Sequence, residues 1–196
     1  MKILAIADEP DKRLWDYLDR RLLEDVDLIL SCGDLPADYL GFISCFTKAP
    51  ILYVHGNHDT KLLADPPGGC DCIDGDLVVV NGIRILGLGG SMRYRGGECM
   101  YNEKEMSKRI RKLWFKLFKY KGFDILLAHA PARDHGDQSD LAHWGFRCFL
   151  KLIDKYHPKY LIHGHIHQSY NPNFKRETEY NGTKIINAYQ RVYIEI

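Results

Sequence analysis

The sequence predicts an α/β protein in which two mixed β-sheets pack against each other between flanking helices. Short apolar runs rich in β-branched residues alternate with amphipathic helical stretches, and two Asn-Gly pairs mark hairpin turns. No internal repeat or linker interrupts the pattern. The chain has 196 residues, of which 45% are hydrophobic, which is enough for one large core. We therefore expect a single domain over residues 1–196.

The first part of the chain predicts a β-α-β-α-β series. Strands are expected at 2–7, 27–31 and 51–55, because each is a short apolar run that ends at polar or turn residues. Helices are expected at 11–24, where leucines recur on one face, and at 37–46. A series of this kind forms a parallel sheet with right-handed crossovers.

The remainder of the chain predicts two hairpins and a further set of helices and strands. Two β-rich arms in residues 76–89 surround Asn81-Gly82. A second turn is expected at Asn181-Gly182, with residues 184–188 pairing back towards 191–196. Between the hairpins the pattern predicts, in order, a helix, a strand, a helix and a strand, at 102–120, 123–128, 141–156 and 160–163.

Charge and cysteine content limit the classes of partner and compartment. The formal net charge is +1, so nucleic-acid binding cannot be inferred from charge balance. The apolar runs are too short for a membrane span, and the start of the chain does not resemble a signal peptide. Six cysteines in such a chain indicate reduced thiols and a cytoplasmic protein.

One local patch is basic despite the neutral balance, on the helix expected at 102–120. Apolar residues at helical spacing should form a stripe that faces the core, while the basic side chains form a solvated face. Contact of this face with nucleic acid or a membrane surface remains an open alternative. The stripe consists of Met106, Ile110, Leu113, Leu117 and Phe118; the basic residues are Lys108, Arg109, Arg111, Lys112, Lys116 and Lys119.

Residues of the types that commonly bind metals follow five of the predicted strands. Singly, each could be a turn former, a helix cap or a satisfied histidine. Together they are expected to converge, because the carboxyl ends of parallel strands open onto the ligand-binding crevice of an α/β sheet. The groups are Asp8, Gly33-Asp34, Gly56-Asn57-His58-Asp59, His129 and His163-Gly164-His165.

Carboxylate, amide and imidazole groups in one place suit phosphoester chemistry. The transition state of phosphoester cleavage concentrates negative charge on oxygen atoms. Two cations about 3.5–4 Å apart stabilise that charge and lower the pKa of a bound water. Oxygen and imidazole ligands together suit Mn, Fe, Zn or Co.

These motifs, in this order from Asp8 to His165, resemble the calcineurin-like metallophosphoesterase superfamily. The resemblance implies a four-layer α/β/β/α sandwich. It also implies a dinuclear site in which Asp34 bridges two ions, with Asn57, His129 and His163 at the second metal and Asp8 and His165 at the first. His58 is similar to the family's catalytic histidine, which protonates the leaving group, and Asp59 is expected to orient His58.

The chain departs from the family pattern after its first strand. The family motif is Asp-x-His, whereas this chain reads Asp8-Glu9-Pro10, and proline offers no side-chain donor. The first metal site is therefore expected to be weak, or to be completed by water, Glu9 or Asp11. Since a strand alternates its side chains, Glu9 is expected to point away from Asp8.

The function implied is hydrolysis of a phosphodiester or phosphomonoester by a metal-bound hydroxide, with a small phosphoester as substrate. Arg93 and Arg95, in a glycine-flanked loop, offer guanidinium groups for the phosphate. The rival is a non-catalytic scaffold of the same fold with an impaired first site, for which the retromer subunit of this superfamily is a precedent. The sequence does not indicate an oligomeric state.

Overall fold

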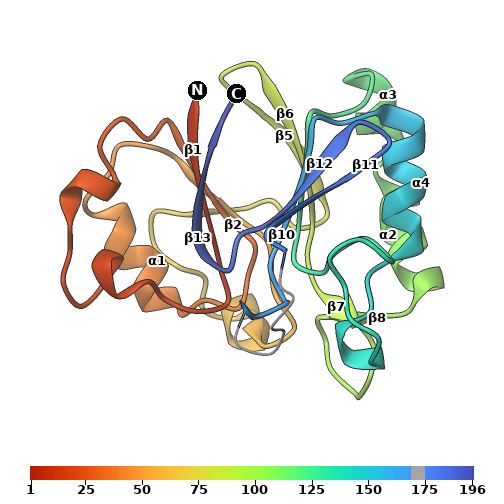
Figure 1. The fold of residues 1–196 in the computed structure, drawn as a ribbon, viewed down its shortest axis with the longest axis horizontal. Coiled ribbons are helices and arrows are strands. Elements are labelled where there is room, and N and C mark those ends of the chain that lie inside the picture. The colour runs from red at the N-terminus through yellow and green to blue at the C-terminus, as the bar shows by residue number, and fades with distance from the viewer. Residues whose placement is uncertain (169–174) are drawn as a thin grey trace.

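The first of two large sheets has five strands in the order β13-β1-β2-β3-β4 (Figure 1). The computed structural model describes residues 1–168 and 175–196. The first four strands along the chain are parallel, and the last runs antiparallel to β1. The parallel series expected at the start of the chain is confirmed. The strands are β1 (Lys2–Ala7), β2 (Leu28–Ser31), β3 (Ile51–Tyr53), β4 (Asp71–Cys72) and β13 (Gln190–Glu195).

The second large sheet has six strands in the order β11-β12-β10-β9-β6-β5. Its four inner strands are parallel, and the two edge strands are antiparallel to their neighbours. The strands are β5 (Asp76–Val80), β6 (Ile83–Leu88), β9 (Ile125–Ala128), β10 (Tyr160–His163), β11 (Glu177–Tyr180) and β12 (Thr183–Asn187). A separate pair joins β7 (Ser91–Met92) to β8 (Met100–Tyr101).

The two sheets pack face to face with helices outside, so the predicted four-layer sandwich is confirmed. Alternate residues of β1 separate the layers: Ile3 and Ala5 join the core between the sheets, whereas Leu4 and Ile6 pack on the outer side. Helix α1 (Ala37–Ser44) covers that outer side. Helices α2 (Glu103–Lys112), α3 (Trp114–Lys119) and α4 (Arg147–Tyr156) lie against the second sheet (Figure 1).

The prediction of a helix at residues 11–24 is wrong. Two short 3-10 helices, Lys12–Leu14 and Arg20–Leu22, occupy this segment instead. Aspartate side chains explain the difference, because Asp11 and Asp19 each accept a hydrogen bond from the backbone N–H two residues later. Such local bonds compete with a continuous helical ladder.

Two further helices are shorter than expected. The segment 102–120 divides at Leu113 into α2 and α3, and of 141–156 only the part from Arg147 is α-helical. A 3-10 turn, Leu141–His143, precedes it. None of the helices in the described ranges is long and apolar enough to span a membrane.

The predicted strand pairing of the C-terminal hairpin is also wrong. Asn181-Gly182 joins β11 to β12, and the last strand, β13, crosses to the first sheet beside β1. Residues 184–188 cannot pair with β13, because β12 already has β11 on one side and β10 on the other. The Asn81-Gly82 turn is confirmed: both residues have positive φ, 49° and 81°, as the tight hairpin turn between β5 and β6 requires.

Candidate metal centre

The strand ends that carry the predicted ligands turn through left-handed backbone. Asp8, Asp34 and His165 have φ of 67°, 57° and 69°, a conformation that costs energy for residues other than glycine. Hydrogen bonds from backbone N–H groups hold these turns: the N–H of Asp8 donates to the carbonyl of Gly33, and that of His165 to the Asp8 carboxylate at 2.8 and 3.0 Å. The turns redirect the chain where each strand stops.

Glycines allow the loops between these turns to approach each other closely. A Cβ on Gly33 would lie 2.3 Å from the backbone nitrogen of Gly56, and one on Gly56 would lie 2.1 Å from Oδ1 of Asp34. Likewise, a Cβ on Gly164 would lie 2.8 Å from Oδ2 of Asp8. Any larger residue would push apart the loops that carry the predicted ligands.

Five of the six predicted ligands converge on one point beside His129. Its Nε2 lies 3.0 Å from Oδ1 of Asn57, 3.1 Å from Nδ1 of His165 and 3.4 Å from Oδ2 of Asp34. Ligand atoms of Asp8, Asp34 and His129 also lie within 4.8 Å of one another. Asp8, Asp34 and Asn57 follow strands of the first sheet, whereas His129 and His165 follow strands of the second.

Both imidazoles are oriented as metal ligands require. Nδ1 of His129 donates to the carbonyl of Cys32 at 2.8 Å, and Nε2 of His165 donates to the carbonyl of Ala142 at 2.8 Å. In each ring the other nitrogen therefore faces the cluster. Ligating histidines characteristically make this second hydrogen bond, which fixes the ring and its tautomer. The donor set thus fits a divalent cation.

The pKa values describe how the cluster holds protons when no cation is bound. Burial lowers the pKa of His129, but the charge and hydrogen bond of Asp34 outweigh it and raise the value to about 9. Burial raises the pKa of Asp8 to about 7. Burial also raises that of Asp34, but His129 and the N–H of His58 lower it to about 2. A proton on His129 therefore compensates part of the carboxylate charge.

His163 does not join the cluster, contrary to expectation, and His167 does. The buried ring of His163 donates from Nδ1 to the carbonyl of Gly164 at 2.9 Å, and its Nε2 faces Gly136. Nε2 of His167 lies 3.9 Å from Oδ1 of Asp8. The sequence offered His167 as an equal candidate, because His165 and His167 have the same two-residue spacing as His163 and His165.

His58 and Asp59 occupy different surroundings from each other. His58 is exposed, and its backbone N–H donates to Oδ1 of Asp34 at 2.8 Å. Asp59 is buried, and its Oδ2 accepts the N–H groups of Gly56 and Asp34, each at 2.7 Å. The expectation that Asp59 orients the His58 ring is not what these bonds indicate. Asp59 instead ties together the two loops that carry Asp34 and Asn57.

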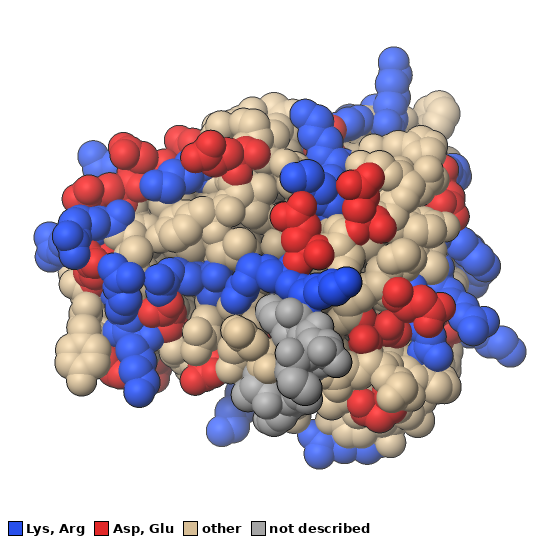
Figure 2. Space-filling view, in the orientation of Figure 1, with Lys and Arg blue, Asp and Glu red and all other residues tan. Residues whose placement is uncertain are grey.

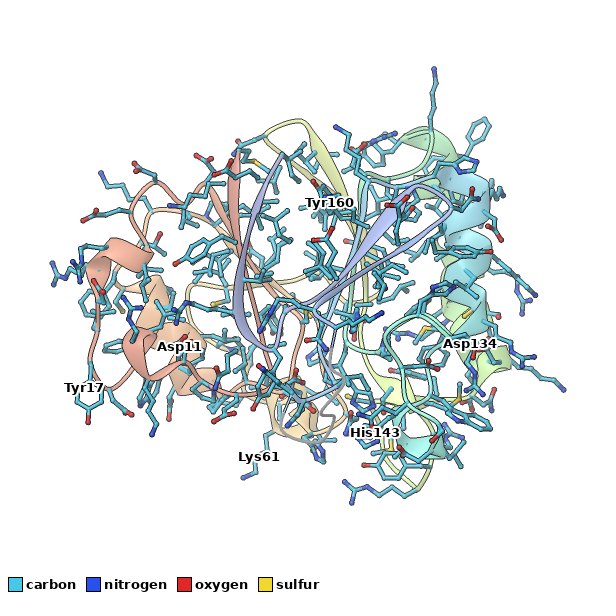
Figure 3. All side chains as sticks on the ribbon, in the orientation of Figure 1. Asp11, Tyr17, Lys61, Asp134, His143 and Tyr160 are labelled. Atoms are coloured by element: carbon cyan, nitrogen blue, oxygen red, sulfur yellow. The ribbon has the colours of Figure 1, made fainter. Side chains whose placement is uncertain are left out.

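A hollow of about 550 Å³ opens over the cluster, at the end of the molecule where His143 is labelled in Figure 3. Two residues that the sequence did not single out, Tyr94 and His143, form part of its wall. The His143 ring packs on that of His165 with centroids 5.3 Å apart, and its Nδ1 contacts the carboxylate of Asp140. Among the described residues, the lining consists of Asp8, Asp34, Asn57, His58, Tyr94, Ala142, His143, His165 and His167.

The two arginines predicted to contact substrate do not line this hollow. Arg93 donates to the carbonyl of Met100 and forms an ion pair with Glu105, each at 3.0 Å. Arg95 lies over the ring of Tyr94, 5.3 Å from its centroid. Tyr94, between them in the chain, is the residue of this loop that reaches the hollow.

The two acidic residues next to Pro10 are also engaged elsewhere. The hydroxyl of Tyr189 donates to Glu9. Asp11 forms an ion pair with Arg191 and accepts the N–H of Arg13 at 2.8 Å. Neither carboxylate lines the hollow, so neither replaces the imidazole that Pro10 lacks.

The two-sheet fold, with a cluster of carboxylate, amide and imidazole groups at its strand ends, is that of the calcineurin-like phosphoesterases. Residues 1–169 match the model of the calcineurin-like phosphoesterase family, so the chain belongs to this family. The family typically binds divalent metals in a dinuclear site. UPF0046 protein K07C11.7 of Caenorhabditis elegans is 23% identical over 196 residues, 87% of this chain and 64% of that protein. The chain thus spans less than two thirds of this relative's length.

Solved structures show the same fold at low sequence identity. TT1561 of Thermus thermophilus is 17% identical with a TM-score of 0.61, covering 96% of this chain and 88% of that one. The 5′-nucleotidase from Candida albicans SC5314 is 13% identical with a TM-score of 0.57, covering 95% and 45%. At such identities the likeness establishes the fold alone.

Proposed function

We propose that this chain hydrolyses phosphoesters at the cluster around His129, using divalent cations of the Mn, Fe, Zn or Co type. The observation that carries the proposal is the convergence of Asn57, His165 and Asp34 on Nε2 of His129, with both imidazoles oriented by backbone carbonyls. Bound cations would supply Lewis acidity to the phosphoryl oxygen and lower the pKa of water. The six cysteines are free thiols, which supports a reducing, cytoplasmic setting.

The proposed ligand set differs from the one that the sequence suggested. We assign Asn57, His129 and His165 to one cation and Asp8 and His167 to the other, with Asp34 between them. His163 is left out because its ring contacts Gly164 and Gly136 instead of the cluster. Because Pro10 stands in place of an imidazole, the site of Asp8 and His167 has fewer protein donors than the site of Asn57, His129 and His165. It should therefore fill at a higher metal concentration than that site.

His58 is the proposed proton donor to the leaving group. Its side chain is exposed at the hollow. Its backbone N–H donates to the carboxylate of Asp34, which we assign to the cations, and this bond holds His58 beside the cluster. A histidine so placed can donate to a phosphoryl oxygen and protonate the departing alkoxide. On the neighbouring loop we assign the substrate contact to Tyr94, with Arg95 held over its ring.

A non-catalytic scaffold is the second candidate, and Pro10 favours it. Neither Glu9 nor Asp11 fills the gap, so one cation site lacks a ligand. Turnover of bis(p-nitrophenyl) phosphate and p-nitrophenyl phosphate with added Mn would distinguish the two candidates. Absence of turnover in a chain that binds Mn would favour the scaffold.

The experiment that tests the site compares His167→Ala with His163→Gln. Bound Mn is counted after desalting, and turnover is measured with excess Mn. We expect His167→Ala to lose one of two ions and most activity, and His163→Gln to keep both ions. Loss of metal in His163→Gln with an unchanged melting temperature would restore the ligand set inferred from sequence. Asp34→Asn should lose both ions.

A further inference from the structure

Helix α3 presents three aromatic side chains to solvent. Trp114, Phe115 and Phe118 are 66%, 60% and 77% exposed. Leu117, in contrast, is 3% exposed and packs on the second sheet. The expectation that Phe118 belongs to a core-facing stripe is therefore wrong. The break at Leu113 explains why Phe118 is exposed. Helix α3 begins anew after it, and the residue of α3 that faces the core is Leu117.

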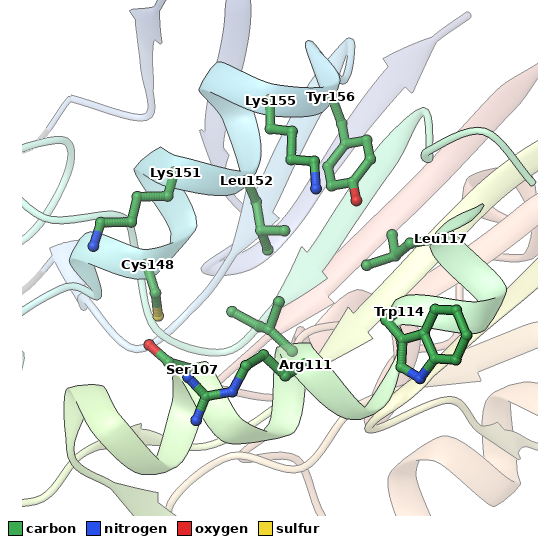
Figure 4. A pocket seen from close by; sticks show the side chains of 10 residues that line it. Ser107, Arg111, Trp114, Leu117, Cys148, Lys151, Leu152, Lys155 and Tyr156 are labelled. Carbon is green, nitrogen blue, oxygen red and sulfur yellow. The ribbon is translucent and has the colours of Figure 1, made fainter.

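Two adjoining hollows lie beside these rings. Their volumes are about 360 and 670 Å³, and they share Trp114, Leu117, Lys155 and Tyr156. Figure 4 shows the smaller of the two. The remaining cations of their walls come from three helices and the turn after α3: Arg111, Lys119, Lys121 and Lys151. The described lining of both hollows includes no acidic residue. This face is therefore apolar at its centre and cationic at its edge.

The charge of this segment differs from that of the whole chain. Residues 111–121 contain five basic and no acidic residues, whereas the formal net charge of the chain is +1. The Lys116 ammonium pairs with Asp76 of β5, so one cation is compensated. Lysine and arginine side chains extend from the surface at this end of the molecule (Figure 2).

We propose that the α3 face binds the surface of an anionic membrane. Aromatic rings favour the region of the lipid head groups, and adjacent lysines are attracted to anionic lipids there. A flat lipid surface can cover all three rings at once. An acidic peptide would pair with the lysines but leave most of the ring surface of Phe115 and Phe118 in water, so we favour lipid. The proposal is independent of phosphoester hydrolysis.

Co-sedimentation with vesicles tests the proposal on the full chain. Vesicles of phosphatidylcholine are compared with vesicles of phosphatidylcholine and phosphatidylserine at 3:1. We expect binding to the anionic vesicles only, weakening as salt rises. Lys119→Gln with Lys121→Gln should weaken binding about fivefold for each lysine removed. Phe115→Ser with Phe118→Ser should abolish it.

The matched control is Tyr17→Ser. Tyr17 is 75% exposed but lies across the molecule from α3 (Figures 1 and 3), and its replacement should leave vesicle binding unchanged. The proposal is overturned if anionic vesicles bind no better than neutral ones, or if Tyr17→Ser weakens binding as much as the α3 variants. It is also overturned if the chain ignores vesicles and elutes as a dimer that Phe115→Ser with Phe118→Ser dissociates, since the face would then bind a second copy. Far-UV circular dichroism checks that each variant is folded.

Discussion

His58 and His129 lie within one cluster but should respond differently to substitution. His58 contacts the cluster through its backbone N–H, so removing its imidazole should leave the metal ligands in place. We expect His58→Ala to keep its bound Mn and lose about 10²–10⁴-fold in turnover. The loss should be smaller for nitrophenyl esters, whose leaving group needs no proton. His157→Asn, at an exposed histidine, is the control; loss of metal from His58→Ala would make His58 a ligand.

His129 makes metal binding depend on pH. The pKa of His129 is raised from 6.5 to about 9, and that of Asp8 from 3.8 to about 7. The protonated form of each group therefore stabilises the metal-free fold relative to the unfolded chain. That stabilisation is lost as pH rises through 7 and then 9. A cation needs both groups deprotonated. Apparent Mn affinity should therefore rise between pH 6 and 9, by about tenfold per unit for each proton released. Calorimetry at pH 6.5 and 8 measures it, and equal affinities would contradict the assignment of His129.

At the level of residues, sequence alone predicted which side chains would lie together in most of the proposed site. Asp8, Asp34, Asn57, His129 and His165 could be found because each follows an apolar strand whose carboxyl end must open at the same edge. The choice between His163 and His167 could not be made this way. It depends on the left-handed turn at His165, which sets the direction of the following side chains. The pattern of apolar residues does not predict this turn.

Among the elements, the loop between β2 and α1 should tolerate an added methyl group poorly. In Gly33→Ala the new Cβ would need left-handed backbone at φ 94° and would lie 2.3 Å from the nitrogen of Gly56. We expect destabilisation of about 2–5 kcal/mol, the sum of backbone strain and overpacking. Gly182→Ala has a similar φ of 80° but open space, so about 1–2 kcal/mol should be lost. Urea denaturation compares them, and equal losses would refute the packing argument.

Strands were more predictable than helices and pairings. A strand such as β1 is buried on both faces, so its apolar run is visible without knowledge of its neighbours. The segment 11–24 has helical periodicity, but hydrogen bonds from Asp11 and Asp19 decide its backbone locally. The partner of β13 depends on which sheet edges are free, and this is a property of the assembled fold.

For the whole molecule, the site lies where the two sheets meet. Asp8, Asp34 and Asn57 follow β1, β2 and β3, and the histidines follow β9 and β10. Under the proposed ligand set, a cation joins the sheets and must stabilise the fold. At 100 times its dissociation constant, Mn should add about 2.7 kcal/mol and raise the melting temperature by about 5–11 °C. Chelation should reverse the shift, and Asp34→Asn should remove it. A shift that persists in Asp34→Asn would place the stabilising ion elsewhere.

The direction of β9 relates the cluster around His129 to the surface of α3. Helix α3 ends at Lys119, shortly before β9 begins at Ile125, whereas His129 follows the other end of that strand. The two features therefore lie at opposite ends of the second sheet (Figure 1). A molecule resting on a bilayer through α3 would hold its hollow outward, open to the aqueous phase. Any phosphoester that the proposed site takes would then arrive by diffusion through water and not from within the lipid layer. A change of membrane attachment would move the hollow within the cell without altering its chemistry.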